Sequence, residues 1–128
     1  MAAGKYNFIV EQGAQHEVTF RYKLSDGTYQ NLSSYRVRMA VKDHITDTDY
    51  VYRASSSSSD DADHLQHFTI ASPQSGDDLG KFTLTIPSGT TTGFDFNQGV
   101  YDLELVDSSD VVTRLLEGKF KIKPQVSD

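Results

Sequence analysis

The 128-residue chain contains neither cysteine nor tryptophan and only three prolines. Without cysteine it has no disulfide framework and no thiolate zinc site, so packing alone must stabilise the fold. No apolar run approaches the roughly 20 residues that cross a bilayer. The first six residues also lack the apolar stretch of a secretory signal. We therefore expect no membrane partner.

Clustered positive charge and helical periodicity are lacking too. The formal net charge of -6 argues against nucleic acid as a partner, because phosphate binding needs a clustered positive surface. Lys119, Lys121 and Lys123 do form a cationic row on one strand face, which is typical of a solvated or edge-protecting face. Any helix should be a short turn.

The chain does show a regular alternation of apolar and polar residues. Residues 99–123 read as one long β-hairpin that ends at Pro124, because two β-rich runs flank a tight polar turn. Apolar and acidic residues alternate in its first strand, so one face is apolar and the other charged. The seven tyrosines and seven phenylalanines suit such half-buried surfaces.

Six further alternating runs predict six more strands. With the hairpin they give about eight short strands, at a spacing typical of a sandwich or barrel. We predict one all-β domain over residues 1–128, an antiparallel β-sandwich of about 7–8 strands. The six runs are Tyr6–Glu11, Glu17–Leu24, Tyr35–Val41, Tyr50–Ala54, Leu65–Ala71 and Gly80–Ile86.

A detail in the hairpin favours the sandwich over the barrel. Gly99-Val100-Tyr101-Asp102-Leu103 resembles the Gly-x-Tyr-x-Cys step that begins strand F of immunoglobulin-like domains. Tyr101 is then expected to bond back to the backbone as a corner tyrosine, and Leu103 to replace the core cysteine.

Three connections carry local signals. Ser25–Thr28 contains Asp-Gly, a strong turn signal. Residues 87–97 form a long connection in which Ser88 or Thr90 is expected to cap one helical turn. Ser55–Asp63 is a low-complexity Ser/Asp-rich segment that buries no apolar area, so we predict an exposed, mobile loop there.

Residues that could carry chemistry do not form a convincing site. His64 and His67 are an odd number apart and point to opposite faces of a strand. Residues 43–49 lack the spacing, the glycine and the closing glutamate of an EF-hand loop, although a loose calcium site remains an alternative. Asp102 and Glu104 share a strand face, but nothing nearby predicts a raised pKa in one of them. No Gly-x-Ser-x-Gly elbow occurs, so we predict a non-enzyme with no catalytic residues, metal or cofactor.

Exposed tyrosines are better candidates for binding. Tyr29, Tyr50 and Tyr52 lie in or beside connections, and Tyr and Arg anchor many interfaces. The alternative interpretation is that they are ordinary strand or core aromatics. Alternating strands also leave sheet edges, which invite a strand from another chain.

Two groups of short motifs stand at the ends of the chain. The front motifs are Tyr6-Asn7-Phe8, Glu11-Gln12-Gly13-Ala14, Phe20-x-Tyr22-Lys23, Ser25-Asp26-Gly27 and Asn31-Leu32-Ser33-Ser34-Tyr35, leading to Arg38-Met39. The back motifs are Tyr101-Asp102-Leu103-Glu104-Leu105, residues 113–119 and Pro124-Gln125-Val126-Ser127. In their order and spacing they resemble a family of small virion proteins of tailed bacteriophages and prophages. The chain departs from the family pattern with Ser33-Ser34 in place of Thr-Gly and with Asp110 in place of Gly.

The resemblance implies an immunoglobulin-like sandwich in a virion, similar in arrangement to the N-terminal attachment domain of upper baseplate proteins. We expect a tail- or baseplate-associated adaptor or connector in several symmetric copies, assembled from the host cytoplasm onto other virion proteins. A capsid decoration protein with the Ser55–Asp63 loop as its tip is the alternative, and a carbohydrate- or calcium-binding module is a third. The expected docking strands are Tyr6–Gln12 and Leu115–Lys123, with Tyr6, Phe8, Val10, Leu115, Phe120 and Ile122 as interface residues.

Overall fold

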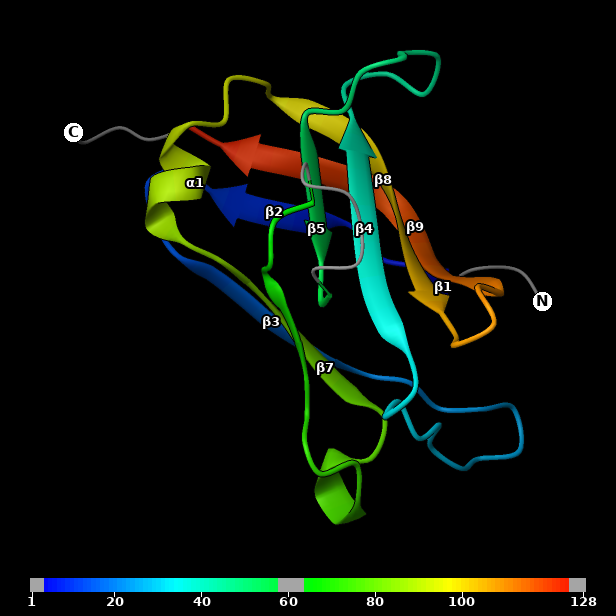
Figure 1. Cartoon of the computed structure of the whole chain (residues 1–128). Coiled ribbons are helices and arrows are strands. Elements are labelled where there is room, and N and C mark those ends of the chain that lie inside the picture. Colours follow the sequence, from blue (N-terminus) through cyan, green and yellow to red (C-terminus); the bar gives the residue numbers. More distant parts are fainter. Residues whose placement is uncertain (1–3, 58–63, 125–128) are drawn as a thin grey trace.

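The computed structural model describes residues 4–57 and 64–124. Within these ranges the chain forms two facing β-sheets joined by short connections (Figure 1). The strands are β1 (Gly4–Lys5), β2 (Phe8–Glu11), β3 (His16–Arg21), β4 (Arg36–Lys42), β5 (Tyr52–Ser55), β6 (Phe68–Ile70), β7 (Lys81–Ile86), β8 (Gln98–Val106) and β9 (Val112–Lys123); η1 (Gly76–Asp78) and α1 (Ser88–Thr92) are single helical turns.

The predicted all-β sandwich is confirmed. The larger sheet has the order β1-β9-β8-β4-β5, with β2 also paired to β9, and the smaller sheet has the order β3-β7-β6. The orders β3-β7-β6 and β9-β8-β4-β5 correspond to the B-E-D and G-F-C-C′ arrangements of immunoglobulin-like domains. The structure departs from the predicted antiparallel arrangement at one place. β1 and β2 run parallel to β9, whereas all the other paired strands are antiparallel.

The start of the chain does not form the single strand Tyr6–Glu11 that the alternation predicts. It is divided into β1 and β2, and both pair with β9. Between them Tyr6 donates its backbone N–H to Glu117, and the Asn7 side chain accepts from the backbone of Lys119 at 3.0 Å. The connection therefore stays fastened to β9 although it leaves the regular ladder.

The core lies between the sheets and is built from the predicted inward positions. Val37, Met39 and Val41 of β4 are at most 1% exposed, and Leu103 of β8 is fully buried. Phe120 on β9 lies at the centre of the aromatic part of this core. Its ring centroid is 5.4 to 6.1 Å from those of Phe8, Tyr52, Phe94 and Phe96.

The helical turn predicted near Ser88 is confirmed as α1, but the predicted cap is wrong. Pro87 occupies the N-cap position, and no side chain caps the turn. Instead Thr91, which is fully buried, accepts from the backbone N–H of Gly13 at 3.0 Å and donates to Ala14 at 2.9 Å. The turn is therefore fixed by the β2–β3 connection rather than by its own N-terminus.

Tyr101 does bond to the backbone, but not in the corner manner expected. Its hydroxyl donates to the carbonyl of Tyr6 at 2.5 Å, 95 residues away in the chain. Burial raises the pKa of Tyr101, with smaller contributions from Tyr6 and Glu117. Gly118 lies at the same place, and a Cβ there would collide with the Tyr6 carbonyl oxygen. The interaction holds the first strands against the last two.

The Ser/Asp-rich segment is only partly covered by the structure. Ser55, which the sequence assigns to an exposed loop, is instead the fully buried last residue of β5. Ser56 accepts from the backbone N–H of Val37 at 2.9 Å, so it belongs to the edge of the sheet. Residues 58–63 lie outside the described residues.

Candidate functional site

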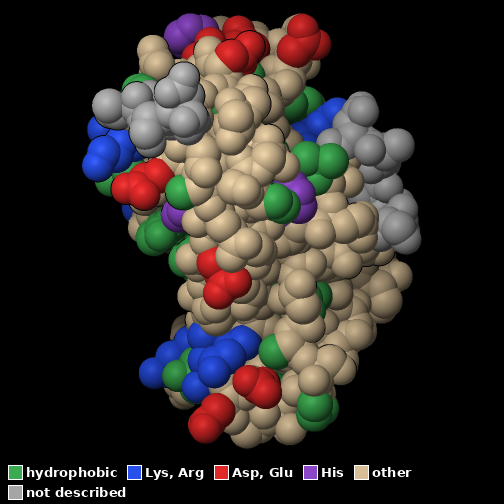
Figure 2. Space-filling model, turned by 90° about the vertical axis from the view of Figure 1, so that its left-hand side faces the viewer, with side chains coloured by type: hydrophobic (Ala, Val, Ile, Leu, Met, Phe, Trp, Pro, Cys, Tyr) green, Lys and Arg blue, Asp and Glu red, His purple; other side chains and the backbone are tan. Residues whose placement is uncertain are grey.

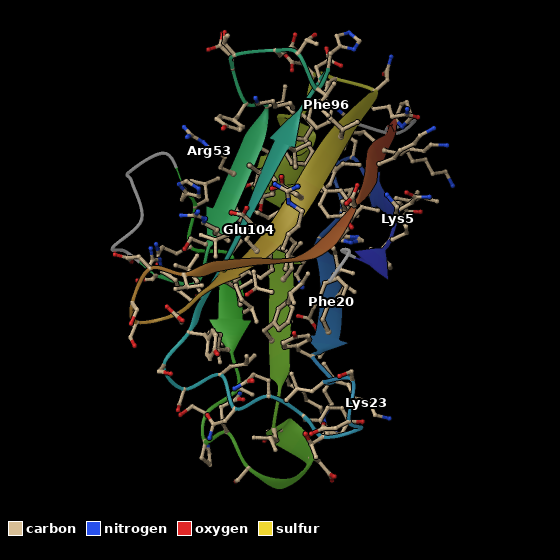
Figure 3. All side chains as sticks on the ribbon, turned by 90° about the vertical axis from the view of Figure 1, so that its right-hand side faces the viewer. Lys5, Phe20, Lys23, Arg53, Phe96 and Glu104 are labelled. Atoms are coloured by element: carbon tan, nitrogen blue, oxygen red, sulfur yellow. The ribbon has the colours of Figure 1, made fainter. Side chains whose placement is uncertain are left out.

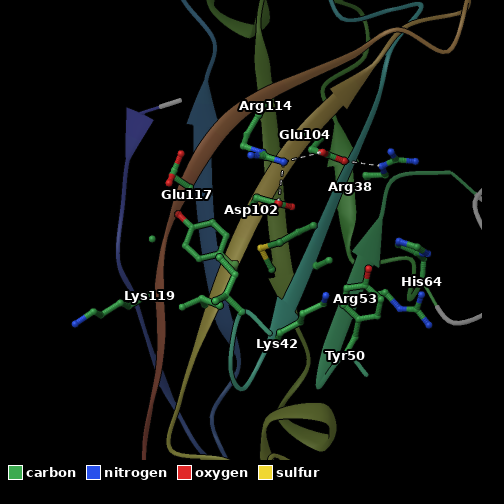
Figure 4. A pocket seen from close by; sticks show the side chains of 16 residues that line it. Arg38, Lys42, Tyr50, Arg53, His64, Asp102, Glu104, Arg114, Glu117 and Lys119 are labelled. Atoms are coloured by element: carbon green, nitrogen blue, oxygen red, sulfur yellow. Dashed lines mark hydrogen bonds and ion pairs between the residues drawn. The ribbon is translucent and has the colours of Figure 1, made fainter. Parts of the chain in front are cut away.

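A hollow of about 680 Å³ lies on the outer face of the larger sheet (Figure 4). Four adjacent strands build it, because the outward side chains of β4, β5, β8 and β9 meet there. Ala40 in the middle of β4 leaves the floor low, and Ile45, Tyr50 and His64 stand along one side. The charged lining residues are Arg38, Lys42, Arg53, Asp102, Glu104, Arg114, Glu117 and Lys119.

Cross-strand ion pairs cover the centre of the hollow. The register places Arg38 opposite Glu104 and Glu104 opposite Arg114. Arg38 donates from Nε to Glu104 at 2.9 Å, and Arg114 lies 3.4 Å from Asp102 and 4.0 Å from Glu104. The Glu104 side chain is only 17% exposed, so these charges interact with less screening than free surface pairs.

The pKa of Asp102 differs from the sequence-based expectation, because nothing in the sequence indicates a raised pKa on this strand. Its pKa is raised, first by burial and then by the negative charge of Glu104, while Arg114 and Arg38 act in the opposite direction. The cause is tertiary, because β4 and β9 on either side of β8 remove water from the carboxylate. Both carboxylates are engaged by arginines of the neighbouring strands.

Tyr50 forms the exposed aromatic group of the hollow. Its ring lies 5.0 Å from the Lys42 ammonium and 4.6 Å from the Arg53 guanidinium, and the residue is 44% exposed. Cation–π contacts of this kind orient both the ring and the cations. The hollow therefore presents an aromatic ring between two basic groups, and two of the three residues, Tyr50 and Arg53, are of types that are enriched in interface hot spots.

The three tyrosines singled out from the sequence have different positions. Tyr50 is exposed as predicted, and Tyr29 is half-buried and stacks beneath Arg21 at 3.5 Å. Tyr52 is a core residue, only 5% exposed, and its hydroxyl lies 2.6 Å from Nδ1 of His67. For Tyr52 the binding interpretation is therefore wrong and the core interpretation correct, because β5 turns this side chain inward.

The six predicted interface residues face the interior of this chain. Phe8, Val10 and Phe120 are fully buried, Ile122 is 7% exposed, and Tyr6 and Leu115 are half-buried against the core. The two strands that carry most of them, β2 and β9, pair with each other. A partner at this margin would therefore contact the backbone edge or outward residues such as Ile9, which is 62% exposed.

The histidines and aspartates considered for metal binding are dispersed. His64 lines the hollow, whereas His67 is packed on Tyr52 at 5.8 Å between ring centroids. In the 43–49 loop, Asp47 accepts from the backbone N–H of His44 and closes a turn. Residues 4–57 and 64–124 contain no group of three or more His, Cys, Asp or Glu that could hold a metal ion. No helix within those ranges is long and apolar enough to cross a membrane.

Sequence reasoning missed the hollow as a unit. The signal was present in the basic residues Arg38 and Lys42 of β4 and the acidic residues Asp102 and Glu104 of β8, which occupy outward positions. Their opposition depends on the register of two strands more than 60 residues apart, and a single sequence does not specify that register.

In comparisons with known proteins, no family model and no curated protein matched this chain. The resemblance to phage virion proteins therefore stays a prediction.

Proposed function

We propose that this protein is a non-enzymatic structural protein of a tailed-bacteriophage or prophage virion, an adaptor of the tail or baseplate that docks onto neighbouring subunits. The observation that carries the proposal is spatial. Pieces from the front and the back of the resemblance meet in one assembled unit, although 95 residues separate Tyr6 from Tyr101 and 112 separate Asn7 from Lys119.

The contacts within this unit use the resembling residues themselves. Tyr101 donates to the Tyr6 carbonyl, Asn7 accepts from the backbone N–H of Lys119, and Arg38 lies opposite Glu104 in the β4–β8 register. A set of pieces that is matched in order and also mutually in contact supports a shared architecture more strongly than isolated matches do.

The departure at position 110 also has a physical explanation that supports the proposal. Asp110 lies in the β8–β9 turn with φ of 63°, a left-handed conformation that glycine adopts at little cost. The resembling proteins have Gly at this position. Asp is one of the few other residues that tolerates such a conformation, so the same turn is compatible with both residues.

The hollow on the larger sheet is the docking surface that the geometry favours. Its lining carries five Lys or Arg residues and three carboxylates, whereas the whole chain has a net charge of -6. A locally basic face selects a partner with an acidic surface. Tyr50 provides the apolar anchor within that face.

The proposal is tested on virions. Particles purified from a lysate of the source phage or induced prophage are analysed by mass spectrometry for this chain, and antibody-labelled particles are viewed by electron microscopy. We expect the label on the tail or baseplate. Label on the capsid would contradict the tail assignment in favour of a decoration protein, and absence of the chain from particles would contradict both.

The docking surface is tested by a Tyr50→Ala/Arg53→Ala variant in the same particles. Both side chains point outward, so the variant should fold and yet be lost from particles. Tyr29→Ala is the matched control, since it removes a tyrosine stacked on a basic residue at another place. Equal incorporation of both variants would show that the hollow is not the docking surface.

A further inference from the structure

The sheets leave four edges, and they are not equally open. Leu65 covers the outer edge of β5 through backbone hydrogen bonds with Arg53 and Ser55. The β1 and β2 edge is interrupted between two short strands, and β6 has only three residues. β3 has six residues, and within the described part of the chain no strand pairs with its outer side. Figure 3 shows β3, marked by Phe20, at the margin of the smaller sheet.

The backbone groups that face this margin can be assigned. Tyr22 donates its N–H to Gly80, so the even-numbered residues of β3 point their backbone groups toward β7. Because these groups alternate along an antiparallel strand, Glu17, Thr19 and Arg21 direct their N–H and C=O groups outward. Three consecutive outward positions are therefore available for a further strand.

We propose that a second copy of this chain occupies the edge, with β3 pairing antiparallel to β3 of its partner across a two-fold axis at Thr19. Outward groups must oppose outward groups, so only registers that pair odd residues with odd residues form hydrogen bonds. Centring the axis on Thr19 pairs Glu17 with the partner's Arg21 and Thr19 with the partner's Thr19. This register uses all three outward positions, and it joins two three-stranded sheets into one of six strands.

The side chains favour the same register. On the outer face, two oppositely charged Glu17–Arg21 pairs form by symmetry, and opposite charges across strands are stabilising. Arg21 donates to Leu79 at 2.8 Å and to Gly76 at 2.9 Å, and Glu17 accepts from Thr85 at 3.3 Å, so both charged side chains lie on the outer face on the β7 side of the strand. On the inner face, half-buried Val18 comes opposite the partner's Phe20 and both lose exposed apolar area.

The edge is only partly protected against such pairing. Charged side chains, proline or a bulge protect a strand edge, and between His16 and Arg21 β3 has only the charges of Glu17 and Arg21, which are complementary in this register. Figure 2 looks onto the side of the molecule opposite the larger sheet, and much of it is neither charged nor hydrophobic. A symmetric dimer is the simplest closed assembly that covers one edge per copy.

The purified chain tests this inference, so its outcome is independent of any virion. Sedimentation equilibrium of the wild type should show a reversible monomer–dimer equilibrium. Glu17→Arg should weaken dimerisation by about tenfold or more, because it places like charges opposite each other twice. Arg21→Glu should do the same, and a mixture of the two variants should restore a heterodimer, since every opposed pair is then oppositely charged. Glu11→Arg, at an exposed position of β2, is the charge-matched control and should have no effect.

A second variant tests the backbone pairing. Thr19→Pro removes an outward N–H while the ladder to β7 keeps its donors, so it should abolish the dimer with far-UV circular dichroism unchanged. A wild type that stays monomeric at several hundred micromolar would overturn the inference. A dimer that survives both Glu17→Arg and Thr19→Pro would also overturn it, because the contact would then lie elsewhere.

Discussion

The outer faces of the two sheets differ in chemistry. On the larger sheet, arginines and carboxylates from three strands form cross-strand pairs such as Arg38–Glu104 and Arg114–Asp102. On the smaller sheet, the outward positions of β3, β6 and β7 are rich in threonine, and Thr19 and Thr83 bond to each other at 3.0 Å. The first face carries a specific pattern of charges, whereas the threonine-rich strands of the smaller sheet suit pairing with a further strand at their edge.

This difference allows a small sandwich to have two kinds of contact. In our proposals, the charged hollow binds a different protein through its basic side chains and Tyr50, and the open edge of β3 pairs with an identical strand through backbone hydrogen bonds and symmetric charges. Both contacts depend on a core that holds the sheets together.

The largest expected effect is the loss of stability when a core phenylalanine is removed, and we expect it to differ between the two sheets. Phe120→Ala on the larger sheet should lower the free energy of unfolding by about 3–5 kcal/mol, because four aromatic rings lose a contact. Phe82→Ala on the smaller sheet should cost less, since the ring contacts only Phe20 and Phe68 among described aromatics. Urea denaturation measures both, and a larger loss for Phe82→Ala would reverse the comparison.

A smaller effect is expected within the charged face. Glu104→Gln should lower the free energy of unfolding by about 1 kcal/mol. The reason is that the partly buried Glu104 carboxylate accepts a charge-assisted hydrogen bond from Arg38. Asp102→Asn should cost less, since burial already disfavours the ionised form of Asp102. The two single variants are compared by thermal melting at pH 7. Equal losses would show that burial does not distinguish the two carboxylates.

The stability of the fold is expected to depend on pH through two histidines. Nε2 of His16 is buried without a hydrogen-bond partner in the described structure, and burial lowers the pKa of His16 below its usual 6.5. Burial also lowers the pKa of His67. Below pH 6.5 the unfolded chain takes up protons that the folded chain resists, so stability should fall as the pH falls below 6.5.

His16→Gln separates this contribution from that of other groups. Urea midpoints of the variant and the wild type are measured from pH 7.5 to pH 5. The variant should lose less stability over that range, because it lacks one of the two histidines. Parallel curves would show that His16 does not cause the acid sensitivity.

The smallest effect is expected in the β8–β9 turn. Asp110→Gly should raise the free energy of unfolding by about 0.5 kcal/mol, because glycine relieves the left-handed conformation at φ of 63°. Loss of the exposed Arg36–Asp110 pair, 3.5 Å apart, should offset little of this gain. Thermal melting measures the change, and a clear decrease would show that the ion pair outweighs the backbone strain.

Local patterns were a good guide where neighbouring residues decide the structure. The inward positions of β4, β7 and β8 follow from alternation, and the Asp26-Gly27 turn forms as expected, with Gly27 at φ of 91°. They were a poor guide where distant strands decide it. The burial of Tyr52 and of Ser55 depends on how β5 is placed against β4 and on Leu65, and neither placement is visible in the local pattern.

The candidate site shows the same division. Tyr50 was recognised as an exposed aromatic from the sequence, but its partners Lys42 and Arg53 come from two different strands. The predicted interface residues were chosen because terminal strands at sheet edges were expected to pair with other chains. In the structure those two strands pair with each other, and these side chains lie in or against the core.

By itself the sequence determined that this is an all-β protein with strands that are apolar on one side, because alternation is a local property of the chain. Only the tertiary structure decided which strands share a sheet, which edge stays open and which charges meet in the hollow. These depend on strand register and on burial by distant segments, and the free energy of such contacts belongs to the whole fold rather than to any single stretch of residues.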